Sequence, residues 1–187
     1  LNLAWFIPLV TFLAFVAIPL VTYRNRKLSH ILVIGAIAIA FLLSQIVFWR
    51  AVAVWNAEHE LAYESAPIHW LVAGAEKFEL AIYVDPATAV MLFMVPLVCM
   101  MIFIYSVGYM NFGTDQVDPR YSRFFSYLSL FATGMLGMIV FNNLLAFFIF
   151  WEIMGTCSYL LIGFWYEKKY PDPDKITPKQ AGLKAFI

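Results

Sequence analysis

Long apolar stretches, separated by short polar segments, dominate the sequence. A helix that crosses a bilayer needs about 20 mainly apolar residues, and five stretches meet that requirement. The pattern therefore predicts transmembrane helices over residues 3–23, 30–49, 86–110, 123–141 and 144–166, and the start of a sixth after Pro178. The expected fold is an all-α polytopic membrane protein.

Residues 55–85 break this pattern. The polar first part, residues 55–65, is compatible with a surface helix or with coil. In the second part, residues 68–72 and 78–84 flank a segment that contains Gly74. Apolar and other residues alternate along residues 78–84, with Phe78, Leu80, Ile82 and Val84 on one side. Strict alternation around a glycine-containing turn predicts a β-hairpin with one buried face.

Charged residues divide the predicted loops into two groups. Basic residues follow the first, third and fifth helices: Arg24, Arg26, Lys27, Arg120, Arg123, Lys168, Lys169, Lys175 and Lys179. The other loops are mainly acidic: Glu58, Glu60, Glu64, Glu76, Glu79 and Asp85. Because cytoplasmic loops carry the excess of Lys and Arg, the basic loops are predicted to be cytoplasmic and the hairpin extracytoplasmic.

The composition supports a membrane protein and excludes several other classes. Of the 187 residues, 63% are hydrophobic and 13% charged, against about 45–50% and about 25% in soluble domains. The formal net charge is zero, which argues against a nucleic-acid partner. The two cysteines, Cys99 and Cys157, lie in apolar stretches, so neither a disulfide scaffold nor a metal cluster is expected.

Glu152 is the strongest candidate for function, because it is the only charged residue between positions 144 and 166. A charge at the bilayer centre costs on the order of 3 kcal/mol, so it must face the protein interior, find a partner or take up a proton. Desolvation raises the pKa of a carboxyl group and a nearby cation lowers it. A buried Glu with a movable Lys partner could therefore relay protons. The alternative is a neutral Glu that hydrogen-bonds and fixes helix packing.

Two further sets of residues are weaker candidates. Thr156 and Tyr159 follow Glu152 on or near one helical face and could line a channel. Ser126, Ser129, Thr133 and Gly137 form a similar stripe on the preceding helix. We interpret each of these small and hydroxyl residues, taken individually, as a residue that serves helix packing.

Lys184 is the second candidate for proton transfer, near the start of the sixth helix. A lysine within a turn or two of a helix start can also extend its amine to the interface. Spacing alone leaves both interpretations open.

Several of these segments resemble one known family. The stretch FWEIMGTCSYLLIGFWY at residues 150–166 is long and distinctive, and Lys184-Ala-Phe follows it. Together with residues 120–127 and 131–143, it closely resembles the L-type (chain 5) antiporter-like membrane subunit of respiratory complex I, the NADH-quinone oxidoreductase. The resemblance covers essentially the whole chain.

The resemblance implies a proton-translocating subunit in a prokaryotic cell membrane or an organellar energy-transducing membrane. Glu152 matches the family's glutamate in helix five and Lys184 matches its lysine in helix six. The partners would be other complex I membrane subunits, including further antiporter-like subunits. FMN, iron–sulfur clusters and the quinone would bind other subunits and no cofactor would bind this chain.

The resemblance also implies a division of the chain. Residues 1–54 form two leading helices, residues 55–85 an extracytoplasmic loop, and residues 86–187 the start of the antiporter-like domain. Since the chain begins with Leu1 and ends within a helical pattern, we expect it to be the N-terminal part of a longer protein.

Three alternatives remain open at this point. The homologous large subunit of a multisubunit Na⁺/H⁺ antiporter carries the same type of glutamate-containing helix. A membrane hydrogenase or a photosynthetic complex I is a further possibility. The third alternative is a membrane scaffold in which Glu152 is structural.

Overall fold

The computed structural model describes residues 1–22, 25–58, 62–73, 76–111, 118–168 and 175–186. Its helices are α1 (Phe6–Ala17), α2 (Arg26–Glu58), α3 (Pro86–Asn111), α4 (Tyr121–Val140), α5 (Leu144–Ile162) and α6 (Pro178–Phe186), with η1 (Asn2–Trp5) and η2 (Ile18–Thr22) on either side of α1. Within the described residues, five helical segments are long and apolar enough to cross a membrane. The predicted five spans are confirmed. A sixth helix begins at Pro178 as predicted, and its crossing of the membrane stays a prediction.

The hairpin is confirmed, but its second strand is shorter than predicted. Strand β2 (Ile68–Ala73) pairs with β3 (Glu76–Leu80), and β1 (Tyr63–Glu64) pairs with β4 (Tyr83–Val84). The alternation predicted one strand through residue 84 with one buried face. Instead the chain leaves β3 after Leu80, and Ala81 is buried although it was expected on the open face. The reason is that Ile82 pairs with Phe141 directly after α4. This contact holds Ala81 and Ile82 against the helices, and both are buried.

Residues 55–65 combine two structures. Helix α2 continues to Glu58, and β1 begins at Tyr63. At about 1.5 Å per residue, α2 is roughly 50 Å long, so it exceeds the ~30 Å hydrocarbon core of a bilayer. Of the two alternatives left open for this segment, a surface helix or coil, the described residues up to Glu58 are helical and form the last part of α2.

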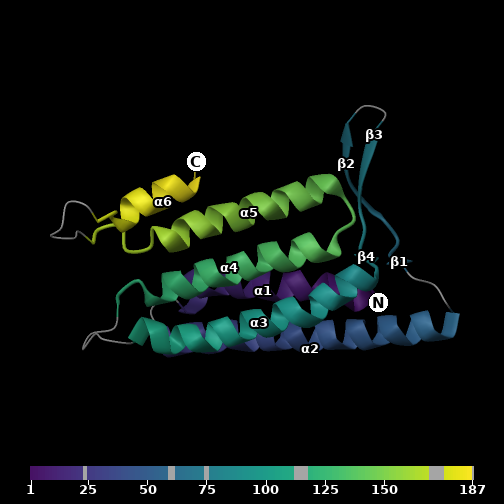
Figure 1. Cartoon of the computed structure of the whole chain (residues 1–187), viewed down its shortest axis with the longest axis horizontal. Helices are drawn as coiled ribbons and strands as arrows, with labels where there is room; N and C mark the ends of the chain where they lie inside the picture. Colours follow the sequence, from purple (N-terminus) through teal and green to yellow (C-terminus); the bar gives the residue numbers. More distant parts are fainter. Residues whose placement is uncertain (23–24, 59–61, 74–75, 112–117, 169–174, 187) are drawn as a thin grey trace.

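Helix α4 is the centre of the bundle, and it packs against α1, α2, α3 and α5. Figure 1 shows the strands and the N-terminus at one end of the helices. The opposite end carries the first turn of α2, the end of α3 and the beginnings of α4 and α6 (Figure 1). The described basic residues of the predicted cytoplasmic loops lie at this second end, which we call the basic end: Arg26, Lys27, Arg120, Arg123, Lys168, Lys175 and Lys179. Which side of the membrane each end faces stays a prediction.

Hydroxyl groups join α4 to α1. Ser129 donates to the Thr11 carbonyl oxygen at 2.8 Å, and the Thr133 hydroxyl donates to the Thr11 hydroxyl at 2.9 Å. Hydroxyl hydrogen bonds between membrane helices contribute about 0.6 kcal/mol on average. The interpretation of Ser129 and Thr133 as packing residues is confirmed.

Asp85 caps the first turn of α3. Its Oδ1 accepts a hydrogen bond from the Thr88 amide at 2.7 Å. This bond lowers the pKa of the Asp85 carboxyl below its ordinary value of 3.8, against the opposing effect of burial. Pro86 follows at the first helical position, where its missing N–H costs nothing.

We expect an Asp85→Asn variant to be less stable than wild type at neutral pH. Because the pKa is lowered in the folded state, the charge stabilises above the unfolded value of 3.8 and stops stabilising as the pH falls below the folded value. Thermal unfolding of wild type and variant across this range measures the gap, which should close in acid. A gap that is unchanged from neutral to acid pH would contradict the charge-based cap.

Candidate functional site

Glu152 lies in the middle of α5, on the face that points away from α4. Its side chain is exposed, and Gly155, Thr156 and Tyr159 on the following two turns are exposed as well. Residues three, four and seven apart share one face of a helix. The structure therefore places Glu152, Thr156 and Tyr159 in one line along α5, as predicted.

The opposite face of α5 explains this orientation. Ala146 and Cys157 are buried there, and Phe150 packs against Gly134 and Gly137 of α4. The two glycines let the α5 backbone approach closely: a Cβ at Gly134 would lie 3.1 Å from the Phe150 carbonyl oxygen. This contact fixes the rotation of α5, and it points Glu152 away from α4.

Lys184 lies on α6, which folds back along the end of α5 (Figure 1). The two helices meet at Gly163 and Gly182, where an added Cβ at Gly182 would be 3.1 Å from the Gly163 Cα. Counted from this crossing, Glu152 and Lys184 are roughly 13 Å apart along the helix axes at about 1.5 Å per residue. Among the residues that the structure describes, neither forms an ion pair. The Glu152 and Lys184 side chains are therefore separate positions along α5 and α6 and not a direct pair.

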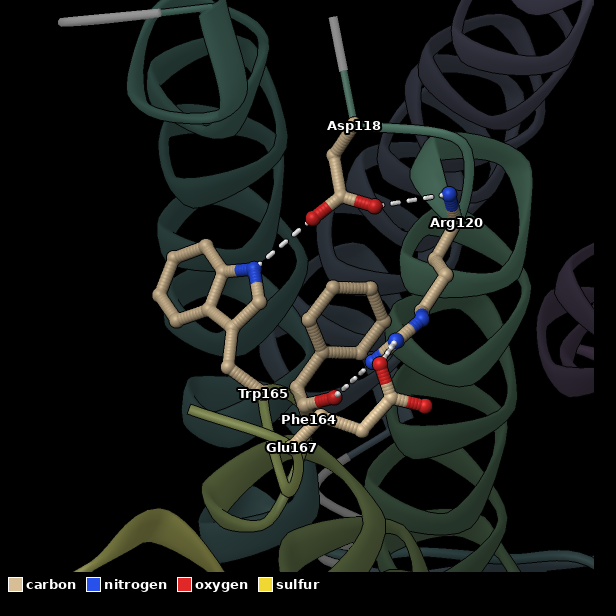
Figure 2. A network of polar contacts seen from close by, with 5 residues as sticks. All are labelled: Asp118, Arg120, Phe164, Trp165 and Glu167. Carbon is tan, nitrogen blue, oxygen red and sulfur yellow. Dashed lines mark hydrogen bonds and ion pairs between the residues drawn. The ribbon is translucent and has the colours of Figure 1, made fainter. Parts of the chain in front are cut away.

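A polar network, drawn in Figure 2, holds the end of α5 to the segment before α4. Asp118 accepts hydrogen bonds from the Trp165 indole N–H at 2.8 Å and from the Arg120 amide at 2.7 Å. The Arg120 guanidinium donates to the Phe164 carbonyl oxygen at 3.4 Å and pairs with Glu167. The hydrogen bonds to the Asp118 carboxylate contribute about 1.5–3 kcal/mol each, whereas the Arg120–Glu167 pair, in which the Glu167 side chain is 63% exposed, contributes at most about 1 kcal/mol. The network fixes the end of the helix that carries Glu152.

Sequence reasoning missed this network. The structure gives the Trp165 indole N–H a specific carboxylate partner, Asp118. Asp118 precedes Trp165 by 47 residues, and no local spacing links them. The signal available in the sequence was two carboxylates, Asp115 and Asp118, shortly before the basic residues Arg120 and Arg123.

Comparisons with known proteins agree with the resemblance seen in the sequence. Residues 70–125 match the family described as NADH-Ubiquinone oxidoreductase (complex I), chain 5 N-terminus. Residues 141–187 match the family described as NADH:quinone oxidoreductase/Mrp antiporter, TM. The chain belongs to the chain 5 family.

Curated chain 5 proteins match nearly the whole chain. Subunit 5 of the chloroplastic NAD(P)H-quinone oxidoreductase of Nephroselmis olivacea is 38% identical over 98% of this chain. Chain 5 of the enzyme of a Synechocystis strain is 37% identical over all of it, and the chloroplastic subunit 5 of Marchantia polymorpha is 38% identical over 98%. The chain spans 25–26% of the length of these relatives.

The two family matches are separated by most of α4, which lies in neither of them. The first match, residues 70–125, contains most of the hairpin, α3 and the start of α4, and the second, residues 141–187, contains α5 and α6. Glu152, Thr156, Tyr159 and Lys184 all fall within the second match. The candidate site therefore lies in the segment that is shared between quinone oxidoreductases and Mrp antiporters.

Proposed function

We propose that this chain is the Glu152-containing part of a proton-translocating membrane subunit of an NAD(P)H-quinone oxidoreductase. Chain 5 relatives bear that enzyme's name. The observation that carries the proposal is the position of Glu152, the sole charged residue in the apolar helix α5, beside Thr156 and Tyr159. The subunit works in an energy-transducing membrane.

Glu152 is the proton-carrying group in this proposal. An exposed carboxylate in the middle of a membrane-spanning helix requires a polar or cationic environment supplied by other helices. When such a cation approaches, the carboxylate is stabilised and releases its proton; when the cation leaves, desolvation favours proton uptake. The neighbouring Thr156 and Tyr159 hydroxyl groups can donate and accept hydrogen bonds, so they can hold water beside the carboxyl group.

Lys184 is a second ionisable group on the same side of α5. It is exposed, and it lies on a helix that packs directly against α5. We assign it to the next step of the relay, because the crossing at Gly163 and Gly182 leaves it too far from Glu152 for a direct ion pair. Water or a further side chain must connect the two groups.

Electron transfer belongs to other subunits in this proposal. FMN, iron–sulfur clusters and quinone are bound there, and this chain contributes the coupled movement of protons. Its partners are the other membrane subunits of the complex, including further antiporter-like subunits, and the lipid bilayer.

A second candidate function is cation exchange by the large subunit of a multisubunit Na⁺/H⁺ antiporter. The match over residues 141–187 favours it, because that family's description names Mrp antiporters. The curated relatives favour the oxidoreductase, since the three named above are all NAD(P)H-quinone oxidoreductase subunits.

Purification of the full-length subunit from its native membrane separates the two functions. We expect it to leave the membrane in mild detergent within a large assembly that contains flavin and iron–sulfur proteins and reduces quinone. The measurement is the protein and cofactor content of that assembly, together with its quinone reductase activity. Recovery with cation-antiporter subunits and without iron–sulfur proteins would replace the proposal with the antiporter.

A further inference from the structure

Two adjoining cavities open at the basic end of the bundle. The first has a volume of about 140 Å³ and lies between α4, α5 and α6, with Arg123, Tyr127, Tyr166 and Lys179 among its lining residues. The second has a volume of about 280 Å³ and lies between α4 and the end of α1. Arg123 and Tyr127 line both cavities, so the two spaces are neighbours on either side of these two side chains.

We propose that the two cavities together bind one anionic phospholipid. The phosphate group binds Arg123 and Lys179 in the first cavity, and one acyl chain lies in the second against Phe15, Ile18 and Pro19. The proposal concerns lipid recognition, and it does not depend on proton transfer at Glu152.

The charge of the first cavity fits a phosphate group. Arg123 and Lys179 contribute two cations, and no carboxylate lines either cavity among the described residues. Neither cation has an ion pair in the part of the chain that the structure describes. Arg120, which lies close by in sequence, is different because its guanidinium already pairs with Glu167. Arg binds phosphate through two parallel hydrogen bonds, and Lys binds it as a point charge.

Aromatic side chains complete the first cavity. Tyr127, Tyr159 and Tyr166 all line it. Tyrosine is enriched at the level of lipid headgroups, because its ring is apolar and its hydroxyl group can contact water or phosphate. The combination of two cations with tyrosines is the composition expected where a headgroup meets the protein.

The second cavity is suited to an acyl chain. Its walls include Phe15, Ile18 and Pro19, together with two serines of α4. Pro19 has no N–H, so it cannot complete an α-helical hydrogen bond, and the chain here widens into the π-helical segment η2. The segment η2 still packs on α4, and the side chains of Phe15, Ile18 and Pro19 line an apolar space next to Arg123.

The location of the cavities supports a lipid as the occupant. Both cavities lie at the basic end, where the positive-inside rule predicts the cytoplasmic surface. Anionic lipids give that surface its negative potential, and basic pockets between membrane helices on this side bind their headgroups. A free anion would use the first cavity only, whereas a phospholipid uses both.

The test uses the detergent-solubilised assembly that contains the full-length subunit. The assembly is first depleted of lipid by detergent washing and then incubated with phosphatidylglycerol, with phosphatidylcholine or with inorganic phosphate. Native mass spectrometry and lipid extraction measure the phospholipid retained per assembly. We expect phosphatidylglycerol to be retained in preference to phosphatidylcholine, and inorganic phosphate at millimolar concentration not to displace it.

Two variants locate the bound lipid. Arg123→Gln combined with Lys179→Gln should lower the affinity for phosphatidylglycerol at least tenfold and remove one retained lipid molecule. Arg26→Gln combined with Lys27→Gln is the matched control, because it removes two cations from the same end without touching either cavity. The control should retain phosphatidylglycerol as wild type does. Arg123→Lys keeps the charge, and it should lower retention by a smaller factor.

Three outcomes would overturn the proposal. The first is equal retention of phosphatidylglycerol and phosphatidylcholine by wild type, which would remove charge recognition even if the double variant does not assemble. The second is an equal loss in the cavity variant and the control, which would indicate general surface attraction. The third is displacement of the lipid by inorganic phosphate, which would indicate an anion site without a role for the acyl chain.

Discussion

A Glu152→Gln variant should assemble normally and lose most of its proton translocation. Glutamine keeps the size and the hydrogen-bonding capacity of the side chain, so the packing of α5 on α4 survives, because that packing uses the opposite face of the helix. What disappears is the titratable proton. The measurement is proton uptake into sealed vesicles per NAD(P)H oxidised, alongside the amount of assembled complex.

Two further variants test whether the loss of proton translocation depends on a carboxylate at the position of Glu152. Glu152→Asp keeps the charge and shortens the side chain by one methylene group, so we expect partial proton uptake. Glu167→Gln removes a carboxylate that lies outside α5 and pairs with Arg120 at the surface. It should leave proton uptake unchanged, since exposed ion pairs contribute at most about 1 kcal/mol to stability. Normal proton stoichiometry in an assembled Glu152→Gln complex would leave Glu152 with a structural role only.

The membrane-spanning part of the fold could be predicted from sequence because length and polarity alone determine it. Each apolar stretch must satisfy its backbone hydrogen bonds internally, and a helix does so without a partner. Errors appear where tertiary contacts decide the structure. The alternation along residues 78–84 could not reveal that Ile82 pairs with Phe141, which directly follows α4, because that contact joins residues 59 positions apart.

The candidate site was predictable to a similar extent. A lone carboxyl group in an apolar helix is visible in the sequence, and helical spacing places Thr156 and Tyr159 beside it. The rotation of α5 was not visible, because it depends on the fit of the Phe150 ring against Gly137 and of the Phe150 backbone against Gly134, both on another helix. The hydrogen bond between Trp165 and Asp118 was not predictable either, since only the folded chain brings these two residues together.

Gly137→Ala should destabilise the packing of α4 on α5 and lower the amount of assembled subunit. A Cβ at Gly137 would lie 2.5 Å from Cδ1 and from Cε1 of Phe150, well inside contact distance. The ring cannot move aside without loss, because it stacks on Phe141 at a centroid distance of 5.1 Å with an interplanar angle of 4°. Overpacking of this kind costs about 1–3 kcal/mol. Thermal unfolding of the purified assembly measures the loss.

Gly108→Ala is the matched control, since nothing lies within 4 Å of an added Cβ there. Replacing glycine by alanine at an open helical position favours the helix by up to about 1 kcal/mol, so the two variants should change stability in opposite directions. A Phe150→Leu substitution should restore part of the stability of Gly137→Ala, because the smaller side chain makes room for the added methyl group. If Gly137→Ala is as stable as Gly108→Ala, the Phe150 ring does not lock α5 onto α4. The outward direction of Glu152 would then need another cause.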